Sequence, residues 1–516
     1  SLNITALELM PINEFNGNDS WGYNPSFYFA VDKAYGPEAK FKELVDACHD
    51  RGIAVILDMV LNHSDWPNPQ ILMWWQGNAP APDNPFFNVQ PPANSFSFFF
   101  DYDHQSQATQ DFTKRVMDFW REEFHVDGFR WDLSQGFTWN ATGGGYDQDR
   151  IDLWAEYGDH VWSQDPSFYM ILEHWTDNNE EKALADLGFM TWANVTHDYQ
   201  EAAMGYGSNL AWASWQERGW NHPRSVSYAE SHDEERLMYK NVQYGNGNSD
   251  YDASELETAL ARMELTACFN LPLPGPKMIW QFGELGYDYS INTCSDGVTV
   301  SEDCRVDAKP VRWDYRDMAS RYRIYQVMSA LSALKRDHPV FQTTDFTWDV
   351  WGSGKRLHLN GSDMNVVVAG NFQVTNLSMT PGFQHTGTWY DYFTGEAVEV
   401  TDLEAAMDFG PGEYHLWTDV ALETPENILA IEEARAPAAF TVGPNPGRNA
   451  RIQFERAPQV SAELHILDLT GRRVANLNVP VGTTELSLPQ GLPDGPLLLR
   501  MVSPEGNQAA YWLNVD

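Results

Sequence analysis

Two acidic side chains, each at the end of an apolar segment, have the residue types of a nucleophile and a proton donor. Asp132 ends the segment GFRWD, in which Arg130 lies two positions earlier and so on the same side of an extended strand. A guanidinium beside a carboxylate favours the ionised form that a nucleophile needs. Glu173 ends the apolar run FYMIL, whose surroundings favour a neutral carboxyl group and hence a general acid. Such a pair is typical of glycoside cleavage with retention of configuration.

Two further polar segments, DMVLNH at 58–63 and ESHDEE at 230–235, have the same setting at strand ends. A single Asp at a strand end more often caps the following helix than performs chemistry. Four such segments in order, each at the C-terminal end of a strand in one barrel pattern, are much harder to explain as caps. The pattern therefore predicts one catalytic site at the C-terminal face of an α/β barrel.

The elements that must position these side chains are short apolar strands alternating with amphipathic helices. Helical spacing of apolar residues is clear at 37–52, which ends on Gly52, and at 111–124 and 321–338. The expected strands are 4–10, 53–59, 126–132, 168–174, 190–196, 225–231 and 277–283. A closed barrel of this kind has eight strands. We therefore expect a TIM barrel without its first βα unit, either because the sequence is a fragment or because a separate segment supplies that unit.

The pattern also divides the chain into regions. The barrel is expected over 1–340, with a small Pro-, Asn- and aromatic-rich lobe inserted at 64–100. Short alternating strands at 341–421 predict an antiparallel β domain, and 422–438 reads as a linker. Residues 439–516 again show short strands with polar turns and predict a small β-sandwich.

The net charge limits the partners that this chain can have. Lysine and arginine total 33 against 73 aspartates and glutamates, which gives −40. A surface this acidic repels nucleic-acid phosphate and anionic lipid, so neither is an expected partner. The sequence also contains no apolar run long enough to span a membrane.

Four cysteines are too few for a disulfide scaffold. Cys294 and Cys304 flank a polar stretch that reads as a loop, and a local disulfide is plausible there if the protein is exported. Cys48 and Cys268 lie in apolar helical patterns and are expected to be buried free thiols.

The four strand-end segments resemble the four short conserved regions of the α-amylase superfamily, in the family's order and on its third, fourth, fifth and seventh barrel strands. The resemblance covers roughly residues 1–420. It implies that Asp132 is the nucleophile that forms a glycosyl-enzyme intermediate and that Glu173 is the acid/base. It also implies that Asp233 binds sugar hydroxyls and helps to distort the ring.

The same resemblance implies roles for the polar and aromatic side chains around the three acids. His63 and His232 would hydrogen-bond the sugar at the cleaved bond, Arg130 would orient the nucleophile, and Asp58 would be a supporting carboxylate. Tyr23, in SWGYNP, resembles the tyrosine that stacks on that sugar. The alternative for Tyr23 is simple loop packing.

Calcium is a further implication of the family, and no organic cofactor is expected. Asn62 matches an asparagine that ligates structural Ca²⁺ in many amylases, and oxygen ligands from the lobe would have to complete such a site. Asp101 and Asp103, in FDYDHQS, are the candidates. The alternative is that Asn62 only hydrogen-bonds backbone.

The C-terminal region resembles the type A sorting domains of Bacteroidetes-type secretion systems. The similarity rests on PNP at 444–446 and LDLTGR at 467–472. It implies a secreted or cell-surface-attached protein that engages the secretion machinery through this domain. The rival is a starch-binding sandwich, but Trp512 is the domain's only tryptophan, so a paired aromatic platform is hard to assemble.

The expected activity is hydrolysis of internal α-1,4-glucosidic bonds of starch or glycogen by a retaining double displacement. The shared carboxylates do not separate this activity from branching or neopullulanase-like transglycosylation and hydrolysis, but export favours hydrolysis. A non-catalytic glycan-binding or assembly barrel is the second alternative, and the presence of all three acids argues against it.

Overall fold

The computed structural model describes most of the chain. Not described are residue 1, segments 92–97, 139–144, 426–427, 429–439, 444–450, 455–461, 469–471, 481–482 and 503–507, and residues 490, 494 and 516. The chain forms two compact units, Ser1–Ile428 and Leu429–Asp516. Most of the predicted linker at 422–438 therefore lies outside the described residues.

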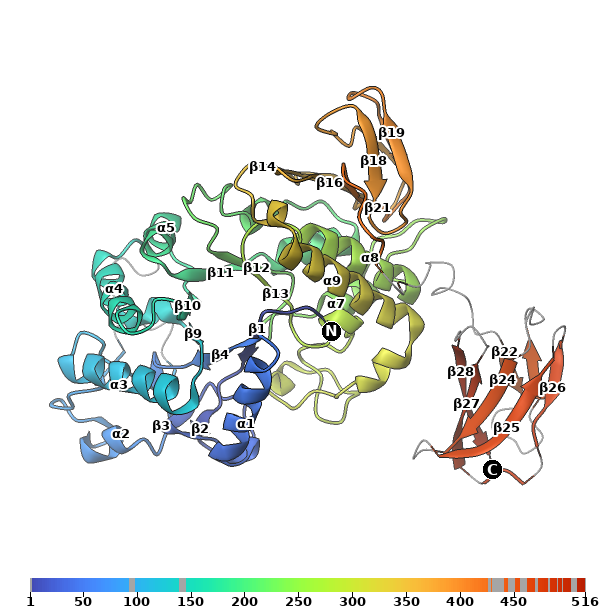
Figure 1. The fold of residues 1–516 in the computed structure, drawn as a ribbon. Helices are drawn as coiled ribbons and strands as arrows, with labels where there is room; N and C mark the ends of the chain where they lie inside the picture. Colours follow the sequence, from blue (N-terminus) through green and yellow to red (C-terminus); the bar gives the residue numbers. More distant parts are fainter. Residues whose placement is uncertain are drawn as a thin grey trace. The chain divides into compact units, whose positions relative to one another are not determined.

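A parallel sheet of seven strands forms the centre of the first unit (Figure 1). In sheet order the strands are β1 (Ala6–Leu9), β4 (Ala54–Met59), β9 (Gly128–Trp131), β10 (Tyr169–Leu172), β11 (Met190–Asn194), β12 (Ser225–Tyr228) and β13 (Lys277–Met278). All seven predicted strands are present, in chain order across the sheet. Strands β1 and β13 are its two edges, and no ladder joins them among the described residues.

Helices follow the strands and cover the outside of this sheet, as in a TIM-type barrel (Figure 1). They are α1 (Glu38–His49), α3 (Gln107–Phe124), α4 (Gln148–Trp162), α5 (Asn178–Leu187), α6 (Thr196–Met204), α7 (Leu237–Tyr244), α8 (Leu256–Asn270) and α9 (Ala319–Asp337). The three predicted helices are confirmed as α1, α3 and α9. Gly52, with φ of 68°, supplies the left-handed turn that ends the segment of α1.

The predicted insertion leaves the barrel after β4. It begins at β5 (His63–Ser64), which pairs antiparallel with β8 (Phe100–Asp101), so the lobe starts and ends on one short ladder. Between them lie α2 (Pro69–Met73), β6 (Trp75–Gln76) and β7 (Ala79–Pro80). A further hairpin, β2 (Asn13–Phe15) with β3 (Pro25–Val31), follows the first strand.

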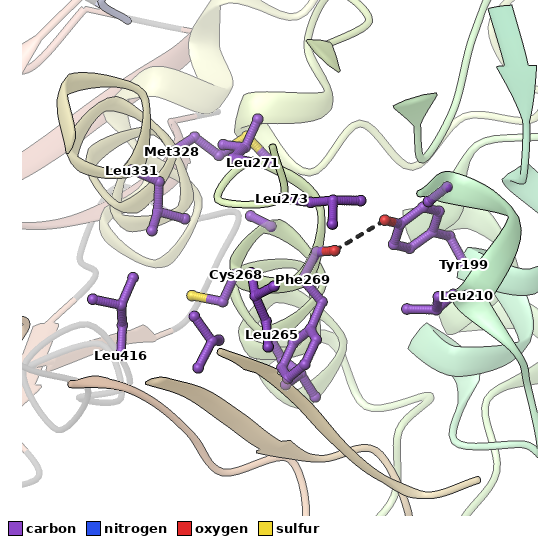
Figure 2. Close-up of a cluster of buried hydrophobic side chains, with 14 of the residues drawn as sticks. Tyr199, Leu210, Leu265, Cys268, Phe269, Leu271, Leu273, Met328, Leu331 and Leu416 are labelled. Carbon is purple, nitrogen blue, oxygen red and sulfur yellow. Dashed lines mark hydrogen bonds between the residues drawn. The ribbon is translucent and has the colours of Figure 1, made fainter. Parts of the chain in front are cut away.

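Two large apolar clusters hold the barrel together. One lies between the first sheet strands and α1, α3 and α4. The other joins α6, α8 and α9 to the following β domain, and Figure 2 shows members of this cluster, among them Leu265 and Phe269 of α8 and Leu331 of α9. The hydroxyl of Tyr199 in α6 donates to the carbonyl of Phe269 at 3.0 Å, so the one polar atom of that ring is satisfied inside the cluster.

An antiparallel sheet of six strands follows α9. Its order is β14 (Phe346–Asp349), β15 (Gly354–Asn360), β16 (Asn365–Asn371), β21 (Tyr414–Thr418), β18 (Gly387–Asp391) and β19 (Ala397–Val400), with β17 (Leu377–Met379) and β20 (Met407–Phe409) as a separate pair. Side chains in β15 alternate between buried and partly exposed. At Gly370 in β16 a Cβ would lie 2.6 Å from Leu265, so this strand packs closely on α8.

The second unit contains two antiparallel sheets around one apolar core. They are β22 (Phe440–Gly443), β23 (Arg451–Phe454) and β26 (Glu485–Ser487), and β25 (Arg473–Val479), β24 (Ala462–Leu467), β27 (Gly495–Val502) and β28 (Gln508–Val515). This agrees with the predicted sandwich. The PNP motif, residues 469–471 of the LDLTGR turn and the side chain of Trp512 lie outside the described part of the chain.

The predicted cysteine chemistry is confirmed. Cys294 and Cys304 form a disulfide, while Cys48 and Cys268 are buried and free. Of the helices that the structure describes, none has the length and apolar character needed to cross a membrane.

Packing around β10 gives a direct test of the core. Leu172 is fully buried in the first cluster, whereas Leu187 at the end of α5 is 47% exposed. Replacing Leu172 by Ala removes apolar contacts and leaves a cavity, so we expect the barrel to lose about 2–5 kcal/mol of unfolding free energy. The matched change Leu187→Ala should cost no more than about 0.5 kcal/mol. Urea unfolding measures both, and equal losses would contradict this core.

Candidate active site

The guanidinium of Arg130 is the centre of a buried ionic cluster at the C-terminal ends of β4, β9 and β10. Its Nη1 lies 2.8 Å from both carboxylate oxygens of Asp58 and 3.3 Å from Oδ1 of Asp132. Its Nη2 forms an ion pair with Oε2 of Glu173 at 3.0 Å. Sheet register explains the first contact, because Asp58 of β4 is the direct partner of Arg130 in β9. Three of the predicted residues thus converge on a fourth.

The cluster is closed on another side by an aromatic ring. The Cζ atom of Arg130 lies 4.1 Å from the ring centroid of Trp192, which belongs to β11. Arg130 is fully buried, so it has lost its hydration and depends on these carboxylates and on this ring. Its position is therefore fixed by four strands of the sheet.

Asp132 and Glu173 both contact Arg130, and their protonation is linked. Burial, followed by repulsion from Glu173, raises the pKa of Asp132 well above its ordinary value, while Arg130 opposes this shift. Burial also raises the pKa of Glu173, which Arg130 and the Leu133 N–H oppose. Arg130 does not by itself keep Asp132 ionised, as the sequence suggested, because it is shared among three carboxylates. Two close carboxylates instead favour a state that holds one proton between them.

The backbone after β9 helps to fix the acid pair. Leu133 adopts a left-handed conformation with φ of 44°, and its N–H donates to Oε2 of Glu173 at 2.8 Å. The hydroxyl of Ser134 donates to the carbonyl of Glu173 at 2.7 Å. A non-glycine residue held at positive φ is a strained feature that clusters at functional sites. This turn therefore orients Glu173 from the strand next to it.

Tyr23 and His63 are held by the protein in a way that the sequence did not indicate. The Tyr23 hydroxyl donates to Oδ2 of Asp58 at 2.6 Å. Burial lowers the pKa of His63 to about 4, so its ring is neutral at pH 7. Nε2 of His63 then donates to the carbonyl of Tyr23 at 2.8 Å, and Nδ1 accepts from the amide of Asn62 at 3.3 Å. Both ring nitrogens of His63 are thus engaged, so in this structure it supports Tyr23 and does not present a free nitrogen to a sugar.

His232 lies among aromatic rings. The ring of Tyr23 stacks on it with centroids 5.0 Å apart and planes 13° from parallel. Trp21, Trp192 and Trp280 contact it at centroid distances of 5.9–6.1 Å. Burial lowers the pKa of His232 to about 3, so the ring is a neutral hydrogen-bonding group within an aromatic surround. Trp192 and Trp280 carried no sequence signal beyond their residue type.

Asp233 lies at the rim of the same site. Its negative charge raises the pKa of Asp58, Asp132 and Glu173, which places it within electrostatic range of all three. Its side chain is 41% exposed and pairs with Arg305 at 2.9 Å. The third predicted carboxylate is therefore present at the site, but with an arginine partner that lies 72 residues away in sequence.

Glu8 in β1 is a site residue that the sequence analysis missed. Burial raises its pKa to about 8, Arg130 lowers it, and Asp58 and Glu173 raise it. The charges of Arg130, Asp58 and Glu173 all act on Glu8, so it belongs to the surroundings of the ionic cluster. Strands of a parallel sheet are covered on both faces and are usually apolar throughout. An acidic residue within the strand ALEL is therefore unusual, and this was the signal in the sequence.

The residues around Asn62 do not complete the expected calcium site. Oδ1 of Asn62 is buried with no hydrogen-bond partner, and a Cβ at Gly136 would lie 2.0 Å from it. The carboxylate of Asp101 accepts from the Asn88 amide, and that of Asp103 accepts from the backbone N–H of Gln105. In the described part of the chain no three acidic or histidine side chains converge at Asn62. Calcium therefore stays a prediction of the resemblance.

The cluster combines groups that suit bond cleavage in a neutral, polyhydroxylated ligand. A linked acid pair can supply a nucleophile and a proton donor, while neutral His232 and Asp233 offer hydrogen bonds. The surrounding indole and phenol rings offer flat apolar faces. Among the described residues of this site, carboxylates outnumber cations, which disfavours an anionic ligand.

The raised pKa of Glu8 predicts a pH-dependent stability. Above its ordinary pKa of 4.5, Glu8 loses its proton in the unfolded chain but keeps it in the folded protein until about pH 8. Stability from this group therefore falls as pH rises through that window. Glu8→Gln keeps the neutral shape, so it should match the wild type at pH 4 and have a higher melting temperature at pH 9. The exposed control Glu122→Gln should gain nothing, and a gain for Glu8→Gln that is equal at both pH values would contradict the shift.

Comparison with known proteins gives partial matches to one group of enzymes. Residues 1–91 match the family described as Alpha amylase, catalytic domain. Malto-oligosyltrehalose trehalohydrolase of Saccharolobus solfataricus is 37% identical over 141 residues, which are 27% of this chain and 23% of that protein. The 1,4-alpha-glucan branching enzyme of Pseudoalteromonas atlantica is 26% identical over 329 residues, which are 56% of this chain and 42% of that enzyme. The chain thus spans less than half the length of these two relatives.

The fold has clear counterparts among solved structures. An Anoxybacillus alpha-amylase matches with a TM-score of 0.64 at 16% identity, over 81% of this chain and 87% of that chain. At this identity the likeness concerns the fold, a barrel followed by a β domain. The chain is thus similar in sequence to alpha-amylase catalytic domains over residues 1–91 and to a branching enzyme over a longer segment, and it shares the fold of a solved alpha-amylase.

Proposed function

We propose that this protein is a retaining glycoside hydrolase that cleaves internal α-1,4 bonds of α-glucans. The observation that carries the proposal is the buried Arg130, which gathers Asp58, Asp132 and Glu173 at adjacent strand ends of an amylase-like barrel. A linked pair of carboxyl groups is the machinery that retaining cleavage needs.

In the proposed first step, a carboxylate oxygen of Asp132 forms a bond to the anomeric carbon. The bond from that carbon to the glycosidic oxygen breaks, and Glu173 gives its proton to the leaving oxygen. In the second step Glu173 takes a proton from water, the water oxygen bonds to the same carbon, and Asp132 is released. Two inversions at one carbon give overall retention.

The linked protonation of Asp132 and Glu173 supports these roles of nucleophile and acid/base. While Asp132 and Glu173 are both free, repulsion between them helps to keep one proton in the pair. Once Asp132 is esterified it carries no charge, so this repulsion disappears while Arg130 and the Leu133 N–H remain beside Glu173. The pKa of Glu173 then falls, which turns the proton donor of the first step into the base of the second.

We assign sugar binding to the groups at the rim of the ionic cluster. Neutral His232 and the carboxylate of Asp233 would hydrogen-bond sugar hydroxyls, and Tyr23 would present its ring beside them. His63 holds the carbonyl of Tyr23, so we assign it to positioning Tyr23 in place of the direct sugar contact that the sequence implied.

Branching is the second candidate, because a branching enzyme is 26% identical to this chain over 329 residues. Two features favour hydrolysis outside the cell. The disulfide Cys294–Cys304 suits an oxidising compartment. The two-sheet C-terminal unit is compatible with a sorting domain, so we propose export to the medium or the cell surface through that unit.

Incubation with amylose tests the proposal. The wild type should produce new reducing ends throughout the reaction and shorten the chains from within, because internal bonds are hydrolysed. New α-1,6 links without new reducing ends would favour branching, and absence of both would favour a non-catalytic barrel.

Asp132→Asn is the companion variant, since it removes the nucleophile but keeps its shape. We expect turnover to be abolished while glucan binding, measured by calorimetry with maltoheptaose, is retained. The exposed control Glu122→Gln should be fully active. Full activity of Asp132→Asn would contradict the assignment of the nucleophile.

A further inference from the structure

We propose that Arg305 is a positioning residue for Asp233 and that the disulfide Cys294–Cys304 holds Arg305 in place for this purpose. The inference rests on the proposed function, because it concerns how the third carboxylate is presented to a glucan. It also assigns a role to a disulfide that the sequence analysis expected in a polar loop.

Arg305 hydrogen-bonds both the side chain and the backbone carbonyl of Asp233. Its Nη2 lies 2.9 Å from Oδ1 and 2.5 Å from the carbonyl oxygen of that residue. The structure shows no hydrogen bond to Oδ2 of Asp233 within the described residues, so this oxygen is the one that a sugar hydroxyl can approach. The arginine thus fixes the rotation of the carboxylate while one oxygen stays accessible.

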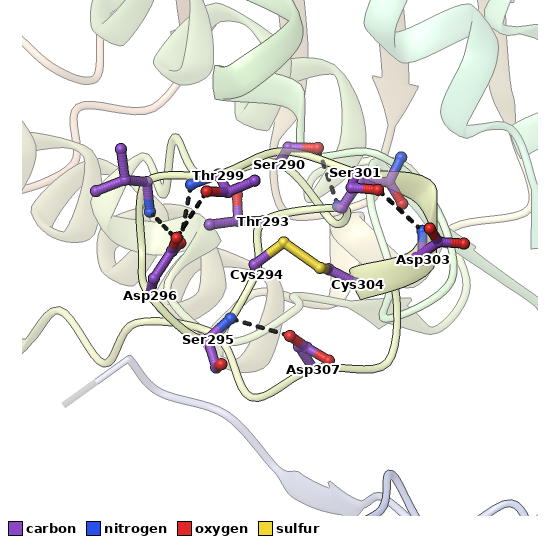
Figure 3. The surroundings of a disulfide bond; sticks show 12 residues. Ser290, Thr293, Cys294, Ser295, Asp296, Thr299, Ser301, Asp303, Cys304 and Asp307 are labelled. Atoms are coloured by element: carbon purple, nitrogen blue, oxygen red, sulfur yellow. Dashed lines mark hydrogen bonds between the residues drawn. A yellow bond between two sulfur atoms is a disulfide. The ribbon is translucent and has the colours of Figure 1, made fainter.

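The segment before Arg305 is built as a closed loop (Figure 3). The disulfide joins Cys294 to Cys304, directly before Arg305, with Cα atoms 4.8 Å apart. Lys309 donates to the carbonyls of Thr293 and Cys304 at 2.8 and 2.7 Å, which ties the two ends of the loop from outside. The backbone of Arg305 therefore starts from a cross-linked point.

Inside the loop, short-range hydrogen bonds add to the cross-link. Asp296 accepts from the backbone N–H groups of Val298 and Thr299, and the N–H of Ser295 donates to Asp307. The bridge between Thr293 and Val300 pairs the two sides. These hydrogen bonds join the loop residues and their flanks to one another and so restrict the loop.

A second contact holds the root of the loop to the segment that carries Asp233. The carboxylate of Glu235 accepts from the hydroxyl of Ser290 at 2.6 Å and from the N–H of Ile291 at 2.9 Å. Residues 233–235 are therefore held at one end by Arg305 and at the other by the start of the same loop. Two contacts from one constrained loop define both the position and the direction of Asp233.

The ion pair between Arg305 and Asp233 contributes more to the position of Asp233 than to the stability of the fold. Arg305 and Asp233 are 44% and 41% exposed, and an ion pair this exposed adds little to folding. Forming this ion pair costs less conformational entropy than it would in a free loop, because the disulfide restricts the loop in the folded and in the unfolded chain. The pair therefore acts chiefly on the geometry at Asp233, where a displacement of about 1 Å can reduce turnover by up to about 100-fold.

The test is a double-mutant cycle with maltoheptaose as substrate. Arg305→Ala should lower kcat/KM by up to about 100-fold with an unchanged melting temperature, and Arg305→Lys should recover part of the loss. In an Asp233→Asn background, Arg305→Ala should have no further effect, because it acts through Asp233. Arg336→Ala is the matched control, since Arg336 and Asp337 are a similarly exposed pair at the end of α9. Additive losses or full activity of Arg305→Ala would overturn the proposal.

The role of the disulfide is tested by its removal. We expect the double variant Cys294→Ser, Cys304→Ser to have a kcat/KM close to that of Arg305→Ala, and reduction of the wild type by a dithiol should have the same effect. When the disulfide is removed in the Arg305→Ala variant, kcat/KM should fall no further. A dithiol gives two electrons and two protons to the disulfide and itself becomes a cyclic disulfide. Undiminished activity after complete reduction would overturn this part.

Hydrogen exchange distinguishes failure of this inference from failure of the proposed function. Arg305→Ala should accelerate amide exchange in the peptide that contains Asp233 and leave β10 unchanged, whether or not the protein turns over glucan. A wild type that leaves maltoheptaose intact but shows this change would refute the proposed function and keep the anchoring. Unchanged exchange would refute the anchoring itself.

Discussion

The buried guanidinium of Arg130 is the constraint on which the site depends. A fully buried charge is tolerated only when partners replace its lost hydration, and here those partners come from β4, from the end of β9, from the end of β10 and from β11. Each carboxylate is therefore held at a strand end by the same cation. A sheet that failed to align these strands would leave the charge unpaired, so folding and assembly of the site are coupled.

The excess of carboxylates over cations follows from this arrangement. A single guanidinium, that of Arg130, is surrounded by the carboxylates of Asp58, Asp132 and Glu173, with Glu8 nearby. Because these groups are buried, ionisation of all four carboxyl groups at once is unfavourable. The site consequently retains protons at pH values where exposed acids have lost them. The same burial keeps the two histidines neutral. Proton donors and neutral hydrogen-bonding groups thus arise chiefly from desolvation, which suits an uncharged sugar.

The parts that follow from local pattern were predictable from the sequence. Strands and helices came from apolar periodicity, and the disulfide from two cysteines that flank a polar loop. The gathering of Asp58, Asp132 and Glu173 at one face was implied by strand ends in a common sheet, whereas the direct pairing of Asp58 with Arg130 follows from the strand register in the structure. By contrast, Arg305 meets Asp233 from a loop 72 residues away, where only tertiary structure decides the contact. The tautomer and partners of His63 likewise depend on a backbone carbonyl, which has no signature in residue type. Glu8 lies within β1 and not at a strand end, and its link to the site depends on the charge of Arg130, which residue type and spacing do not indicate.

The central claim, that Asp132 becomes covalently linked to the sugar while Glu173 moves the proton, can be tested by trapping. In Glu173→Gln, maltotriosyl fluoride can still leave fluoride without a proton donor, but the second step lacks its base. A glycosyl-enzyme should therefore accumulate, and mass spectrometry of proteolytic peptides should find the added maltotriosyl mass on Asp132. Added mass on another carboxylate, or rapid turnover of the fluoride without any adduct, would contradict the account.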